Sequence, residues 1–249
     1  MRIRDRWLLG LGLAGLSVLG WETWSYRNRL HEYTQNERWE TRLADEQGYG
    51  GKIIVFFGDS QLGYWPMAES FGSLPIINRG AFGAWAMNAN ARLEQDVLAF
   101  SPTAVVLMFG DNDFEHGQPE AEILANIEQL IDRMQERSIT VILCGLLPAS
   151  GHWLQFHSAA SVTEFNERLR TVGLKDHVQF VDFYPLLADK RGEFSAALTR
   201  DGLHPNRYGY LRMTRELLPV IFPLFDLKRN KYHPAPVAAV QRQLPSGGY

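Results

Sequence analysis

Four short polar blocks contain the residue types that split an ester through a covalent acyl-serine. They are Gly58-Asp59-Ser60, Asn78-Arg79-Gly80, Gly110-Asp111-Asn112-Asp113 and Asp201-Gly202-Leu203-His204. A serine hydroxyl is a weak nucleophile until a base removes its proton, and the reaction also needs donors for an oxyanion. Each block alone is explained as an ordinary turn or helix cap. All four in order, each where a strand is expected to end, predict a hydrolytic site.

Ser60 is the predicted nucleophile. It directly follows the apolar run 53–57, and Gly58 allows the chain to turn sharply off a strand. A helix beginning here would direct its amino end toward the developing negative charge. The alternative is that Asp59 or Ser60 only caps a helix. The elbow pattern Gly-x-Ser-x-Gly of other hydrolases is absent, because Leu62 fills its last position.

His204 is the predicted general base, and Asp201 is the carboxylate expected to orient it. One local turn brings the aspartate to Nδ1 of the imidazole, which fixes the tautomer. Pro205 excludes His204 from helical geometry, and Asn206 is placed to cap the last helix. The remaining histidines lack a comparable carboxylate: His31, His116, His152, His157, His177 and His233. No metal-ligand spacing is present, so we expect neither metal nor cofactor.

Gly80 and Asn112 are the predicted oxyanion donors, together with the backbone N–H of Ser60. Glycine lets its N–H approach a substrate closely, and an asparagine amide donates without carrying charge. The alternatives are a simple turn at Gly80 and a loop cap at Asn112.

Strand-like and helix-like segments alternate from residue 52 onward. Apolar runs rich in β-branched residues lie at 53–57, 75–77, 104–109, 140–143 and 178–181. Helical periodicity lies at about 84–99, 119–137, 160–172 and 206–218. This pattern predicts an α/β domain whose parallel sheet is covered on both faces. Ligands of such sheets bind beyond the carboxyl ends of the strands, where Ser60, Gly80 and Asn112 are expected.

The amino terminus predicts a membrane anchor within residues 1–26. Three arginines precede an uncharged stretch at 7–21, which spans about 22 Å as a helix and is short for a bilayer core of about 30 Å. Tryptophans and a tyrosine at its two ends extend the membrane contact to residues 7–26. The arginines would remain cytoplasmic, with the domain on the periplasmic or extracellular side. A cleaved signal peptide, giving a secreted protein, and a soluble cytoplasmic protein are the alternatives.

Composition and sequence pattern argue against three further features: nucleic-acid binding, an internal disulfide and a dinucleotide site. The 249 residues carry a net charge of −3 without a long basic block, so nucleic acid is not expected to bind. The single cysteine, Cys144, excludes an internal disulfide. The string Gly10 to Gly15 matches a dinucleotide fingerprint, but no strand precedes it, and small-residue packing in a membrane helix explains it.

We divide the chain into anchor (1–26), polar stalk (27–51), catalytic domain (52–226) and disordered tail (227–249).

The combined blocks resemble the SGNH (GDSL-type) hydrolase family over about residues 52–218. Its serine, glycine, asparagine and histidine correspond to Ser60, Gly80, Asn112 and His204. The resemblance implies a three-layer α/β/α, flavodoxin-like domain with a five-stranded parallel sheet. It also implies a triad of Ser60, His204 and Asp201, an oxyanion hole from Ser60, Gly80 and Asn112, and no cofactor.

Two positions depart from that pattern. Gln61 replaces an aliphatic residue after the serine, and Asp111 replaces a residue that is often threonine. Neither is a catalytic group, so the resemblance still implies activity. Trp65, a few residues after the serine, is similar to a tryptophan in branches of the family that remove small acyl groups from carbohydrates.

The sequence therefore predicts a serine esterase that removes small acyl groups, such as acetyl, from an envelope carbohydrate. The alternatives are a lysophospholipase or thioesterase acting on longer acyl chains, an O-acyltransferase of cell-surface polysaccharide, and a non-catalytic binding domain. The ester substrate is the expected partner, and the sequence predicts no oligomeric state.

Overall fold

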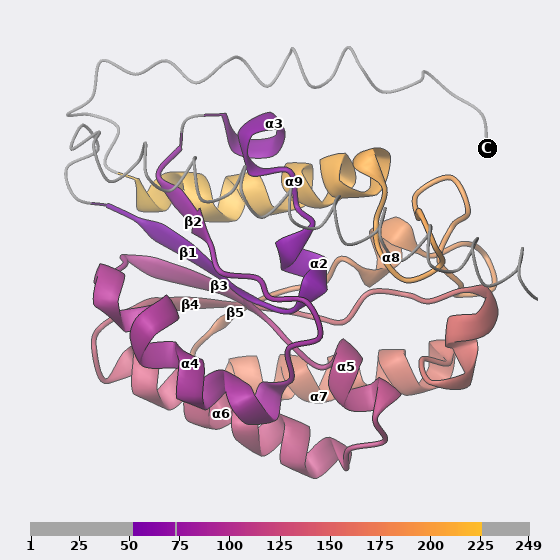
Figure 1. Ribbon diagram of the computed structural model, residues 1–249, viewed down its shortest axis with the longest axis horizontal. Helices are drawn as coiled ribbons and strands as arrows, with labels where there is room; N and C mark the ends of the chain where they lie inside the picture. Colours follow the sequence, from indigo (N-terminus) through magenta and orange to yellow (C-terminus); the bar gives the residue numbers. More distant parts are fainter. Residues whose placement is uncertain (1–51, 73, 226–249) are drawn as a thin grey trace, which may run out of the picture.

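Five parallel strands form the centre of the molecule. The computed structural model describes residues 52–72 and 74–225, and within them the strand order is β2-β1-β3-β4-β5 (Figure 1). The strands are β1 (Ile54–Gly58), β2 (Ile76–Asn78), β3 (Ala104–Met108), β4 (Thr140–Cys144) and β5 (Gln179–Val181). All neighbouring pairs are parallel, and every residue of β1 and β3 is buried. The predicted five-stranded parallel sheet is confirmed.

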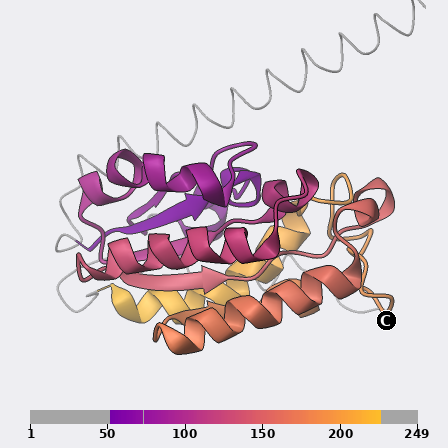
Figure 2. The same cartoon turned by 90° about the horizontal axis from the view of Figure 1, so that it is seen from below.

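Helices cover both faces of this sheet, giving the predicted three-layer α/β/α architecture. One layer contains α4 (Ala86–Asp96), α6 (Glu120–Gln135) and α7 (Ala159–Lys175). The opposite layer contains α3 (Met67–Phe71), α8 (Tyr184–Leu187) and α9 (Arg207–Ile221). Figure 1 shows the sheet between the two layers, and Figure 2, seen from below, shows the layer of α4, α6 and α7 in front of the sheet. Short elements complete the described fold: α2 (Ser60–Gly63), α5 (Asp111–Glu115), η2 (Leu98–Phe100), η3 (Gly151–Gln155) and η4 (Phe222–Leu224).

Alternation along the strands produces two cores. Val55 and Phe57 of β1 belong to the cluster that includes α4, α6 and α7, whereas Ile54 and Phe56 belong to the cluster that includes α3 and α9. Side chains of a strand point alternately to its two faces, so a strand that is apolar throughout must be covered twice. This is the physical reason for the continuous apolar runs in the sequence.

The chain reverses direction across the sheet between β1 and β3. From β1 it crosses to β2 on one side, then passes to β3 on the other. Helix α2 begins directly after β1, and α5 begins shortly after β3. Such a reversal opens a crevice at the carboxyl ends of the two strands, where ligands of open α/β sheets bind. The predicted nucleophile and the predicted asparagine donor lie in these two helices.

The predicted anchor (1–26), stalk (27–51) and tail (227–249) lie outside the described residues. Among the helices of the described part, none combines the length and apolar character needed to cross a bilayer. The predicted helix cap Asn206 is confirmed, because its Oδ1 accepts hydrogen bonds from the N–H groups of Tyr208 and Gly209.

Candidate active site

The turn after β1 presents the hydroxyl of Ser60. Gly58 is required there, because a Cβ would lie 2.3 Å from the carbonyl oxygen of Met108. Asp59 caps α2, with Oδ1 accepting from the N–H of Gln61 at 2.9 Å. The capping role therefore belongs to the buried Asp59, and the Ser60 hydroxyl is available for another partner.

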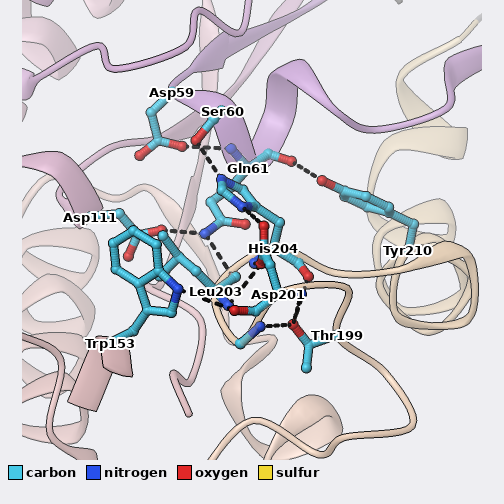
Figure 3. Close-up of polar contacts among 11 residues, drawn as sticks. Asp59, Ser60, Gln61, Asp111, Trp153, Thr199, Asp201, Leu203, His204 and Tyr210 are labelled. Atoms are coloured by element: carbon cyan, nitrogen blue, oxygen red, sulfur yellow. Dashed lines mark hydrogen bonds and ion pairs between the residues drawn. The ribbon is translucent and has the colours of Figure 1, made fainter. Parts of the chain in front are cut away.

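That partner is His204, which lies 144 positions away in the chain. Ser60 Oγ is 2.9 Å from His204 Nε2, and His204 Nδ1 is 2.8 Å from Asp201 Oδ2 (Figure 3). The His204 side chain is 14% exposed and the Asp201 side chain 41% exposed, so the site opens toward solvent. The structure thus joins the three predicted triad residues in one continuous chain of contacts.

The surroundings of Asp201 keep its carboxyl group ionised. Burial raises the pKa of its carboxyl, but the hydrogen bond and charge of His204 and the N–H groups of His204 and Leu203 outweigh it and lower the pKa to about 2. Oδ1 accepts these N–H groups at 2.8 and 3.0 Å, while Oδ2 faces the imidazole. A carboxylate at Nδ1 keeps the proton there, leaving the lone pair of Nε2 toward Ser60.

The turn that carries His204 is fixed by Thr199 and Gly202. Thr199 Oγ1 donates to the carbonyl of His204 at 2.8 Å and accepts from the N–H of Gly202 at 2.9 Å. Gly202 has φ +90°, and a Cβ there would lie 2.7 Å from the carbonyl oxygen of Ser150. Trp153 Nε1 donates to the carbonyl of Asp201 at 3.2 Å. Thr199 and Trp153 were not among the predicted site residues, since a lone threonine or tryptophan in a loop carries no spacing signal.

Gly80 lies beside the nucleophile turn but does not present an open N–H. A Cβ at Gly80 would lie 2.2 Å from the backbone nitrogen of Gly63. The close backbone approach that this glycine permits is therefore to α2, whereas the sequence predicted an approach to a substrate. Its N–H donates to Asn78 Oδ1 at 2.9 Å. For Gly80 to serve as an oxyanion donor, this bond must be shared or broken, so the role stays a prediction.

Gly83 is a second candidate donor, which the sequence prediction missed. It has φ +69°, it is exposed, and the space that a Cβ would occupy is open. Within the described residues its N–H has no acceptor, and the same holds for the N–H of Ser60. Asn112 Nδ2 donates to the carbonyl of Ala84 at 3.0 Å, which places this amide beside the Gly83 turn. The available signal was a second glycine three positions after Gly80.

Trp65 does not line the site. It is 1% exposed, and its indole N–H lies 3.1 Å from the hydroxyls of both Ser70 and Thr214. It packs in the core beneath α9, so it does not contact a substrate. Its presence therefore does not support the prediction of a small acyl group. Within residues 52–72 and 74–225, no group of three or more His, Cys, Asp or Glu side chains is arranged to hold a metal ion.

The chain is similar to known hydrolases over most of this domain. Residues 43–212 match the model of the GDSL-like lipase/acylhydrolase family. An acetylxylan esterase of Xylanibacter ruminicola is 23% identical over 200 residues, which cover 72% of this chain and 39% of the relative. The chain therefore matches only about two fifths of that relative's length.

Solved structures share the fold, for example the following two. A GDSL-like lipase from Bacteroides thetaiotaomicron has 25% identity and a TM-score of 0.66, covering 76% of this chain and 97% of its own. Axe2, an acetylxylan esterase from Geobacillus stearothermophilus, has 20% identity and a TM-score of 0.56, covering 74% of this chain and 98% of its own.

Proposed function

The chain belongs to the GDSL-like lipase/acylhydrolase family, and we propose that it is a serine esterase that hydrolyses a carboxylic ester through an acyl-serine. The observation that carries the proposal is the unbroken line of contacts from Ser60 Oγ through His204 to Asp201. A nucleophile, its base and the group that orients the base are the required parts of this chemistry.

In the acylation step, Ser60 Oγ attacks the ester carbonyl while His204 Nε2 takes the hydroxyl proton. Asp201 stabilises the imidazolium that forms. The carbonyl oxygen becomes an oxyanion, toward which the N–H of Ser60, the free N–H of the Asn112 amide and the N–H of Gly83 are available donors. Collapse breaks the ester C–O bond, and His204 returns the proton to the departing alcohol. Water then repeats the sequence on the acyl-serine and releases the acid.

The substrate that we favour carries a small acyl group, such as acetyl, on an envelope carbohydrate. The support is that the matching relative and two structural neighbours are described as acetylxylan esterases. Hydrolysis of longer acyl or thioester chains and acyl transfer to a sugar hydroxyl use the same acyl-serine. A substrate panel separates them: we expect p-nitrophenyl acetate and acetylated oligosaccharides to be cleaved faster than long-chain esters. A preference for long chains would reject the acetyl substrate.

The nucleophile is tested with a fluorophosphonate probe, which reacts with activated serines. We expect the wild-type protein to be labelled and Ser60→Ala to lose both labelling and hydrolysis. Ser161→Ala, which changes a serine on α7 that contacts Ser158, is the matched control and is expected to behave as wild type. Hydrolysis that persists in Ser60→Ala would reject the mechanism.

We also propose that residues 7–26 anchor the protein in a membrane, with the catalytic domain on the periplasmic or extracellular side. The support is the arginine-flanked apolar stretch with aromatic residues at both ends. Cleavage of the segment as a signal peptide is the alternative, and it would release the same domain.

A further inference from the structure

The two positions that depart from the family pattern contact each other beneath the site. Gln61 Nε2 donates to Asp111 Oδ2 at 2.6 Å, and the two residues are 1% and 4% exposed. The same nitrogen donates to the carbonyl of Leu203 at 3.1 Å. Figure 3 shows the Gln61 side chain extending between Asp111 and the turn that carries His204. One buried amide therefore bonds two segments that are far from it in the chain.

Each end of this arrangement is adjacent to a residue of the proposed mechanism. Gln61 follows Ser60 in α2, and its two acceptors, Asp111 and Leu203, directly precede Asn112 and His204. The backbone of Gln61 is held as well, because the Tyr210 hydroxyl of α9 donates to its carbonyl at 2.8 Å. The amide thus links the nucleophile turn, the asparagine helix α5 and the histidine turn.

The orientation of the Gln61 amide follows from its partners. Both partners are oxygen acceptors, so the NH₂ group must face them, and a flipped amide would place its own oxygen against two others. Oε1 has no hydrogen-bond partner within the described residues. Bonds from an amide to a buried carboxylate are stronger than those between neutral groups. Among the described residues, the side chain therefore acts as a double donor whose bonds go only to these two segments.

We propose that Gln61 is a positioning residue, which sets the placement of Ser60 relative to His204 and to the Asn112 amide. The proposal rests on the serine mechanism but concerns a residue that touches no reacting atom. A buried amide that bonds one segment is different: in the part of the chain that the structure describes, Asn166 bonds only the backbone N–H and carbonyl of Leu146, at 2.7 and 2.9 Å. Asn166 is 2% exposed, so it is comparable in burial and in number of bonds.

The test compares Gln61→Leu and Gln61→Glu with Asn166→Leu. Leucine removes both donors at similar size, and glutamate keeps the shape but offers an acceptor where donors are needed. We expect kcat and the rate of fluorophosphonate labelling to fall about 10- to 100-fold in both Gln61 variants, with KM little changed, because small displacements of reacting groups are costly. Asn166→Leu is expected to lower Tm while keeping the wild-type kcat and labelling rate.

The outcomes separate this inference from the proposed function. Gln61 variants that label as fast as wild type would overturn the positioning role and leave the serine mechanism intact. A wild-type protein that does not label would overturn the mechanism itself. If Gln61→Leu does not fold, the double variant Gln61→Leu/Asp111→Thr takes its place. It also removes the buried carboxylate of Asp111, which has lost its donor, and its kcat and labelling rate are compared with wild type in the same way. A double variant with the wild-type labelling rate would equally reject the proposal.

Discussion

At the scale of single residues, the carboxylate of Asp201 is held by contacts within its own turn. Its two carboxylate oxygens accept from the imidazole and from two backbone N–H groups, so its position is determined by its own turn. Such local determination explains why the sequence alone could predict a contact between the two: a histidine that lies three positions after an aspartate and precedes a proline has few possible arrangements. The contact between His204 and Ser60 is different, because it depends on the whole fold.

We expect Asp201→Asn to lower kcat by about 10³- to 10⁴-fold. The amide NH₂ would face Nδ1 and favour the imidazole tautomer that has its proton on Nε2, where it cannot accept from Ser60. Kinetics with p-nitrophenyl acetate measure the effect. Asp189→Asn is the matched control, since Asp189 also accepts backbone N–H groups in a turn, from Arg191 and Glu193. A loss below tenfold in Asp201→Asn would contradict the assigned role.

The pH dependence follows from the lowered pKa of Asp201. A carboxyl whose folded pKa is below its unfolded value adds stability above the unfolded pKa, and that stability is lost as pH falls toward about 2. Asp201 therefore stays ionised from about pH 4 to pH 8. We expect the acid limb of kcat/KM to have a slope of one, because Asp201 does not take up a proton in this range. A limb with a slope of two would show that a second group controls the activity.

Asp59 shows the opposite electrostatic behaviour. Complete burial and the charge of Asp111 raise the pKa of its carboxyl well above the ordinary value, although the N–H of Gln61 opposes this. Its second oxygen has no hydrogen-bond partner among the described residues. A raised folded pKa favours folding at low pH, and this contribution is lost as pH rises through the folded pKa.

We therefore expect Asp59→Asn to be more stable than wild type at neutral pH, because asparagine keeps the cap acceptor without the buried charge. The expected gain is on the order of 1 kcal/mol, or about 2–4 °C in Tm. The gain should shrink as pH falls, because protonation of Asp59 then relieves the wild type. Thermal melts at several pH values measure it, and a lower Tm for Asp59→Asn at neutral pH would contradict the prediction.

At the scale of elements, the turn between β2 and α4 contains two glycines with different constraints. A Cβ at Gly80 would meet the backbone of α2, whereas a Cβ at Gly83 would meet open space at a positive φ. We expect Gly80→Ala to lower the free energy of unfolding by about 3 kcal/mol and Gly83→Ala by about 1 kcal/mol. Urea unfolding of the two variants measures the difference. Equal destabilisation would contradict the packing of Gly80 on α2.

The same element scale shows what the sequence could predict. Each expected strand and each of the four expected long helices is present within a few residues of the predicted bounds, because apolar alternation and periodicity extend over whole elements. The short helices α3, α5 and α8 were not predicted, and α2 was anticipated only from the turn and cap residues at its start, since four or five residues show no periodicity. Two of them, α2 and α5, carry Ser60 and Asn112. The contact of Gln61 with Asp111 was also not predictable, because no local rule relates positions 50 apart.

At the scale of the whole molecule, the described domain is one sheet with two independent cores. The predicted anchor lies outside it, so the domain and the amino-terminal segment can be tested separately. We expect full-length protein to sediment with membranes and a variant lacking residues 1–26 to stay in the supernatant. Both should have the same kcat, because the deleted residues precede the described domain. Full-length protein in the supernatant, with its amino terminus intact, would contradict the anchor.

The two halves of the triad lie at opposite ends of the domain sequence, and this has a consequence for biosynthesis. The nucleophile leaves the ribosome early, but the base follows 144 residues later, and α9 closes the layer that holds it. On the proposed mechanism, a nascent chain therefore carries a serine without its general base until residue 204 has been synthesised. We expect a translation product that ends before His204 to lack ester hydrolysis, because it has no base to activate Ser60.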